Sequence, residues 1–124
     1  MYIEKIADKD GEGFDWDVTV SDGEHKLLCF AGKEVKMDDK IELTCYFSEK
    51  LRKSKKKSFF IEKEDWYYGY KLRAKAVDVE KGDFEVYGFR FILDEYLPEN
   101  MTNGDFLEFT CIRMDCEKAS EGVL

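Results

Sequence analysis

A run of cations at residues 49–60 offers the clearest chemistry in the chain. Six of its positions carry Lys or Arg: Lys50, Arg52, Lys53, Lys55, Lys56 and Lys57. The solvent face of a strand expected at residues 70–79 adds Lys71, Arg73 and Lys75. Because such side chains neutralise phosphates and other anions, these nine residues form the candidate anion-binding or nucleic-acid-binding site.

Six aromatic residues, five of them at the end of this run or shortly after it, are the candidates for contact with a partner. They are Phe30, Phe59, Phe60, Trp66, Tyr67 and Tyr68. Bases stack on exposed rings, and aromatic side chains are also enriched where proteins meet. Acidic residues follow at once in the segment 62–65, and Lys outnumbers Arg, the better stacking residue. We therefore rank a solvated loop or a contact with an anionic protein above nucleic-acid binding.

The single histidine, His25, is the residue best suited to acid–base catalysis. It follows Asp22 and Glu24, whose carboxylates would orient an imidazole or raise its pKa. No nucleophile motif and no glycine-rich phosphate loop accompanies it in the sequence. We expect no catalytic residue and no cofactor, and therefore a protein that is not an enzyme.

The cysteines Cys29, Cys45, Cys111 and Cys116 are expected to be reduced thiols rather than zinc ligands. Their spacing contains no Cys-x-x-Cys pair, and the first three lie in apolar segments typical of buried strands. Only Cys116, in "MDCEK", is expected to be exposed. The sequence predicts no metal site among them.

A second metal pattern fails in the same way. Asp8, Asp10, Glu12 and Gly13 match the start of a calcium-binding loop. The match breaks at Asp15, where an apolar residue is required, and at Thr19, where a bidentate glutamate is required. We interpret the segment as an acidic turn that leads into a strand.

Charge divides the chain into a small basic part and a large acidic remainder. The 124 residues hold 28 Asp and Glu against 20 Lys and Arg, a net charge of -8. An acidic surface repels the phosphate backbone, and it favours association with a basic protein through complementary potentials. Length and composition fit one folded domain spanning residues 1–124.

Alternation of apolar and polar residues predicts strands along most of the chain. A hairpin is expected at residues 14–31, with Phe14, Trp16, Val18 and Val20 on one face. The next strand directs Ile41, Leu43, Cys45 and Phe47 inward. Residues 70–79 alternate up to a slip near Ala76 that suggests a bulge. One strand is expected at 84–94, with Gly88 as a bend, and another at 106–115.

These strands predict an all-β fold, a small antiparallel barrel with at most a short helix, for example at Pro98 or after Ser48. The alternative is a two-layer sandwich. A long basic connection, Glu49 to Trp66, follows the third strand. In that respect the arrangement resembles barrels that bind oligonucleotides and oligosaccharides, the OB type.

The function we expect is non-enzymatic binding of another protein, or self-association. Leu28 and Phe30 give their strand a second apolar face that something must cover. The alternatives are binding of single-stranded nucleic acid by the basic loop 50–57, and an acidic inhibitor or immunity-type protein. No apolar segment is long enough to span a bilayer, and no signal peptide is readable, so we expect a cytoplasmic protein that does not bind membranes.

Overall fold

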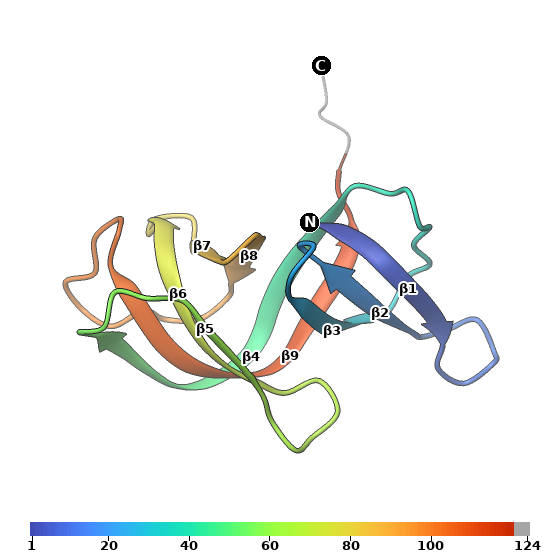
Figure 1. Cartoon of the computed structure of the whole chain (residues 1–124), viewed down its shortest axis with the longest axis horizontal. Coiled ribbons are helices and arrows are strands. Elements are labelled where there is room, and N and C mark those ends of the chain that lie inside the picture. Colours follow the sequence, from blue (N-terminus) through green and yellow to red (C-terminus); the bar gives the residue numbers. More distant parts are fainter. Residues whose placement is uncertain (121–124) are drawn as a thin grey trace.

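The computed structural model describes residues 1–120, and its regular elements in that range are all β-strands (Figure 1). The strands are β1 (Tyr2–Asp8), β2 (Trp16–Ser21), β3 (Lys26–Ala31), β4 (Ile41–Ser54), β5 (Phe60–Lys63), β6 (Tyr70–Asp78), β7 (Asp83–Val86), β8 (Phe89–Leu93) and β9 (Phe106–Lys118). The predicted all-β class is confirmed. Within residues 1–120 there is no helix with the length and apolarity needed to cross a membrane.

Five strands close into a small barrel. Around the ring, β9 pairs with β4, β4 with β8, β8 with β7, β7 with β6, and β6 again with β9. β5 extends this sheet beyond β6 as an edge strand. The predicted small barrel is confirmed, and the sandwich alternative is set aside.

The barrel is mixed, whereas the sequence predicts an antiparallel one. β4 and β8 run parallel, with Leu43 opposite Phe91 and Cys45 opposite Leu93. The other pairs of the ring are antiparallel. Strand direction cannot alternate all the way around a ring with an odd number of members, so one neighbouring pair has to be parallel.

The first three strands form a separate meander beside the barrel (Figure 1). β3 lies parallel to β9 there, with Phe30 opposite Asp115. The predicted hairpin is confirmed for Trp16 to Ala31, while Phe14 precedes the strand and is exposed. β4 and β9 pair along almost their whole lengths and run through both parts of the molecule.

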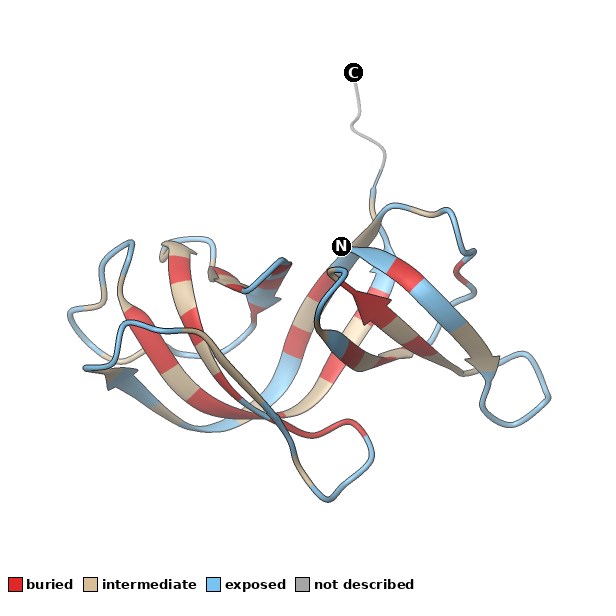
Figure 2. Ribbon diagram, viewed as in Figure 1, coloured by how far each residue is buried: buried red, intermediate tan, exposed pale blue. Residues whose placement is uncertain are grey.

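Alternate side chains of these strands face one hydrophobic core, visible as alternating bands in Figure 2. In β6 the buried positions are Tyr70, Leu72, Ala74 and Ala76, as predicted. The expected slip is a register shift between Ala76 and Asp78. Val18 and Leu27 of the meander belong to the same buried cluster, so the meander and the barrel share one core.

Two strand predictions need correction. The single strand expected at 84–94 is the hairpin β7–β8, in which Val86 pairs with Phe89 across a turn at Tyr87 and Gly88. Tyr87 adopts a left-handed φ of 50°, which the sequence does not signal. Phe47, predicted to point inward, is 53% exposed, because register shifts on either side of it turn β4 out of phase.

The long basic connection is also shorter than predicted. β4 continues to Ser54 and β5 begins at Phe60, so only residues 55–59 link these two strands. No helix forms after Ser48 or at Pro98 within the described residues. The feature that suggested the OB-type resemblance is therefore mostly strand, because pairing with β9 extends β4 to Ser54, past the first three cations.

Candidate binding groove

Several of the predicted site residues meet in one groove on the outer surface of β4, β9, β6 and β5. Its volume is about 550 Å³. The lining residues are Glu49, Lys50, Arg52, Phe60, Glu64, Trp66, Lys71, Leu72, Arg73, Glu108, Phe109 and Thr110. Four candidate cations and two candidate aromatics are thus brought together with residues of β9 that lie far along the sequence.

Two arginines in the groove share one carboxylate. Pairing places Glu108 of β9 between Arg52 of β4 and Arg73 of β6. Glu108 accepts hydrogen bonds from Arg52 Nη2 at 2.7 Å, Arg73 Nε at 2.8 Å and the Ser54 hydroxyl at 2.9 Å. Arg73, then Arg52, then Ser54 lower the pKa of Glu108 to about 2. Both arginines are therefore held in place by hydrogen bonds to Glu108.

The two aromatic residues of the groove differ in their availability. The guanidinium of Arg73 lies 5.5 Å from the ring centre of Phe60, so one face of Phe60 is covered. Trp66 is 41% exposed, and its indole N–H donates to the Ile112 carbonyl at 3.3 Å. Trp66 is therefore anchored at its edge and open to solvent over much of its surface.

The end of the basic run lines a second hollow, of about 520 Å³. It is formed by Lys53, Ser54, Lys55, Lys57, Gly104, Asp105 and Phe106. Lys53 pairs with Asp105 at 3.2 Å, and farther along β6 Lys75 lies 3.9 Å from Glu85. Within residues 1–120, Lys50, Lys55, Lys56, Lys57 and Lys71 form no ion pair.

A second group of candidate aromatics lies across the junction between meander and barrel. Arg113 lies between two rings, 4.4 Å from the centre of Phe30 and 5.1 Å from that of Phe47. Phe30 meets Tyr68 edge-on at 5.8 Å, and Tyr68 meets Tyr67 at 4.8 Å. We call these five residues the aromatic face.

Asp17 fastens the aromatic face to β2. Its carboxylate accepts hydrogen bonds from the hydroxyls of both Tyr67 and Tyr68. Burial and the Asp17 contact raise the pKa of Tyr68, and the Asp17 hydrogen bond raises that of Tyr67. Tyr67 and Phe47 remain 56% and 53% exposed, so the face is both fixed and accessible.

Phe59 lies apart from both groups. It packs against Phe106 and Tyr87, with ring centres 5.7 and 5.5 Å away. It is partly buried against the core cluster. Of the six predicted aromatics, Phe59 is thus the one used for packing within the barrel.

His25 joins two turns. Its ring stacks on Tyr87 with centres 3.7 Å apart. Asp22 accepts from the Gly88 N–H at 3.0 Å and contacts His25 Nδ1 at 3.2 Å. Burial alone would raise the pKa of Asp22, but backbone hydrogen bonds from His25, Glu24 and Gly88 together lower it well below its usual range. The turn of the meander is therefore locked to the β7–β8 turn.

The four cysteines are buried free thiols, and the prediction that Cys116 is exposed is wrong. β9 continues through Cys116 to Lys118, which keeps that side chain on the core side. Burial raises the pKa of Cys116 to about 12 and that of Cys29 well above its usual range. The Cys45 and Cys111 sulfurs lie 3.1 Å apart.

The calcium-like segment is closed by its own first carboxylate. Asp8 accepts from the N–H groups of Gly11 and Gly13, both at 3.0 Å. Across residues 1–120, no group of three or more His, Cys, Asp or Glu side chains is placed to hold a metal ion. Asp8 therefore stabilises a turn.

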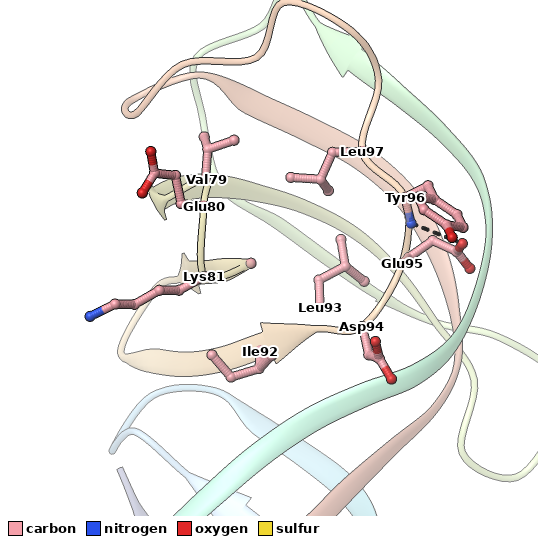
Figure 3. Close-up of a pocket in the computed structure, with 10 residues that line it drawn as sticks. Val79, Glu80, Lys81, Ile92, Leu93, Asp94, Glu95, Tyr96 and Leu97 are labelled. Carbon is pink, nitrogen blue, oxygen red and sulfur yellow. Dashed lines mark hydrogen bonds between the residues drawn. The ribbon is translucent and has the colours of Figure 1, made fainter.

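Figure 3 shows a third hollow, of about 480 Å³, beside the β6–β7 turn. Val79, Leu93 and Leu97 lie in its centre, and charged side chains such as Glu80 and Asp94 lie at its edges. Tyr96 on its wall is 95% exposed. None of the sequence candidates lines this hollow.

Sequence reasoning missed Glu108, Arg113 and Asp17, which organise the two candidate sites. Each is a charged residue inside an alternating strand segment, so the pattern predicts only that it faces solvent. Comparison of the chain with family models, curated proteins and solved structures gives no match. The geometry of this protein therefore carries the functional argument alone.

Proposed function

We propose that this protein is a non-enzymatic binding module that engages another protein through its aromatic face. The observation that carries the proposal is the stack of Phe30, Arg113 and Phe47 beside the exposed Tyr67. Tyrosine, tryptophan and arginine supply most of the energetic centres of protein interfaces. Two of these three residue types are present in the aromatic face, tyrosine as Tyr67 and Tyr68 and arginine as Arg113.

Preorganisation supports the same proposal. Asp17 fixes both tyrosines, and Asp115 holds Arg113 through two hydrogen bonds of 2.7 and 3.0 Å. A partner would therefore bind side chains that have already lost much of their rotamer freedom, which lowers the entropic cost of association.

The acidic surface favours a basic partner, as an inhibitor or immunity-type protein would have. Complementary charge raises the association rate, and the effect weakens with salt. The proposal includes a cytoplasmic location, in keeping with four free thiols. The likeness of this protein to OB-type barrels rests on the closed five-stranded barrel alone.

A capture experiment with matched variants tests the proposal. Wild-type protein is immobilised and exposed to extract from the source cells, alongside Phe47→Ala with Tyr67→Ala, and Tyr96→Ala. We expect a partner that the double variant loses and Tyr96→Ala retains, because Tyr96 is exposed but lies outside the aromatic face.

Two results would count against the proposal. One is a partner retained equally by all three proteins. The other is the repeated absence of any partner together with a monomer by light scattering, which would also exclude self-association. Circular dichroism of each variant verifies that the fold survives the substitutions.

A further inference from the structure

The two hollows that contain the basic run adjoin one another along β4, because the Ser54 hydroxyl of the second donates a hydrogen bond to Glu108 of the first. Arg52 lines the first hollow and Lys53, the next residue of β4, lines the second. We call the residues lining these two hollows the basic track. It leads from Trp66 over β6 and β9 to the exposed lysines that follow β4.

We propose that single-stranded nucleic acid binds along the basic track, with phosphates on its lysines and a base stacked on Trp66. This site is separate from the protein-binding function proposed above.

The charge of the track is opposite to that of the protein. Seven Lys and Arg line it, against four Asp and Glu. The whole chain has the reverse balance, 20 against 28. A polyanion is therefore repelled by most of the surface and attracted along this one path, which confines its binding to the track.

The lysines of the track are free to contact phosphates. Lys50, Lys71, Lys55 and Lys57 have no ion pair among residues 1–120, whereas Arg52 and Arg73 both pair with Glu108. Lys50 adopts a left-handed φ of 59° at a break in the β4–β9 register. That break places Lys50 on the groove side, in the same hollow as Lys71 of β6.

Trp66 supplies a stacking surface for an unpaired base, which favours a single strand over other polyanions. Its indole N–H donates to the Ile112 carbonyl, and the residue remains 41% exposed at the groove. An unpaired base can stack on such a ring, whereas a base inside a duplex is already stacked on its neighbours. Thr110, on the groove floor, adds a hydroxyl beside Lys71.

Fluorescence anisotropy with a labelled oligothymidylate of about 12 nucleotides tests the site, a length within the usual range for small barrels. We expect binding at low salt that weakens as salt rises. With four lysine–phosphate contacts, the slope of log affinity against log salt is about -3. A labelled duplex of the same sequence should bind at least several-fold more weakly.

Two variants with the same change in charge separate a site from general attraction. One replaces Lys50, Lys55, Lys57 and Lys71 by alanine, and the other replaces four lysines outside the track, Lys5, Lys33, Lys36 and Lys81. We expect the first to lose at least tenfold in affinity and the second to lose little. Equal losses, or no binding by wild-type protein at low salt, would overturn the proposal.

The role of Trp66 has its own readout. In a Trp16→Phe background, Trp66 is the sole tryptophan, and we expect its emission to be quenched on oligothymidylate binding. Trp66→Ala should weaken binding by about tenfold, the usual effect of losing one stacked base. Unchanged emission, or duplex binding as tight as single-strand binding, would contradict the stacked base. Neither outcome bears on the aromatic face, whose Phe47 and Tyr67 are intact in these variants.

Discussion

The two halves of the basic run each carry three cations but lie in different surroundings. Arg52 and Lys53 lie in β4, where each has a carboxylate partner from the segment that contains Asp105 and Glu108. Lys55, Lys56 and Lys57 follow the strand and form no ion pair within residues 1–120. Arg52 and Lys53 are thus tied to the barrel by ion pairs, whereas Lys50 and the three lysines after β4 have no ion pair among residues 1–120.

Strand pairing produces this difference. Arg52 and Arg73 lie opposite the same residue of β9 from its two sides, and that residue is Glu108. Without it, the two cations on the strands that flank β9 would repel one another. The pairing of β4 with β9 ends at Ser54, so the three lysines that follow have no residue of β9 paired opposite them.

Removing the shared carboxylate should have the largest effect on this contrast. Glu108 is 20% exposed, and Glu108→Ala leaves Arg73, itself 13% exposed, beside Arg52 without a counter-charge. We expect a loss of about 2 kcal/mol in the free energy of unfolding, measured by urea denaturation. A loss as small as that expected for replacing Lys55, Lys56 and Lys57 by serine would mean that the Glu108 ion pairs contribute nothing to stability.

Acid should remove the same contribution. The pKa of Glu108 is lowered from 4.5 to about 2, so its stabilising effect is complete above pH 4.5 and is lost as the pH falls toward 2. We expect Glu108→Gln to be less stable than wild type at neutral pH, with a difference that shrinks over that range. Asp22, whose pKa is also lowered, gives both proteins a further acid-dependent loss. A constant difference from pH 7 to 2 would contradict the assignment.

Replacing the more buried of the two arginines should cost more of the free energy of unfolding. Arg73 is 13% exposed, covers Phe60 and also bonds Ser58, while Arg52 is 77% exposed. We expect Arg73→Ala to cost about 1–2 kcal/mol and Arg52→Ala about 0.5 kcal/mol, by the same urea assay. The reverse order would show that packing against Phe60 matters little.

The smallest effect is expected for the free lysines. Replacing Lys55, Lys56 and Lys57 together by serine removes no ion pair of the described residues. The free energy of unfolding should change by less than about 0.5 kcal/mol, because surface substitutions away from partners are nearly neutral. A loss comparable to that of Glu108→Ala would remove the distinction between the halves.

The strand pattern could be predicted where one face is buried and the other is polar. β6 is the clearest example, because Leu72, Ala74 and Ala76 alternate with charged residues, and even its bulge is readable. β1 was not predicted, since in "YIEKIAD" only Ile3 is fully buried and the alternation is weak. Local alternation therefore identifies strands with a buried face better than edge strands.

The candidate sites could be predicted only in part from the sequence, for a different reason. Lys50, Arg52 and Trp66 attract attention by residue type, but their neighbours across the sheet depend on register. Glu108 lies between Arg52 and Arg73 only because β4 and β6 both pair with β9, and the sequence around Glu108 does not reveal that pairing. Phe47 faces solvent because of a shift that alternation cannot show.

The position of β9 has a consequence for how the chain is made. It pairs with β3, β4 and β6, which come earlier in the sequence, so the barrel has no closed form until residues 106–118 have left the ribosome. Until then the β6–β7–β8 hairpins and the meander expose apolar faces and unpaired edges. The nascent protein is therefore at its most aggregation-prone just before completion of β9, and a helper that shields hydrophobic surface would act in that interval.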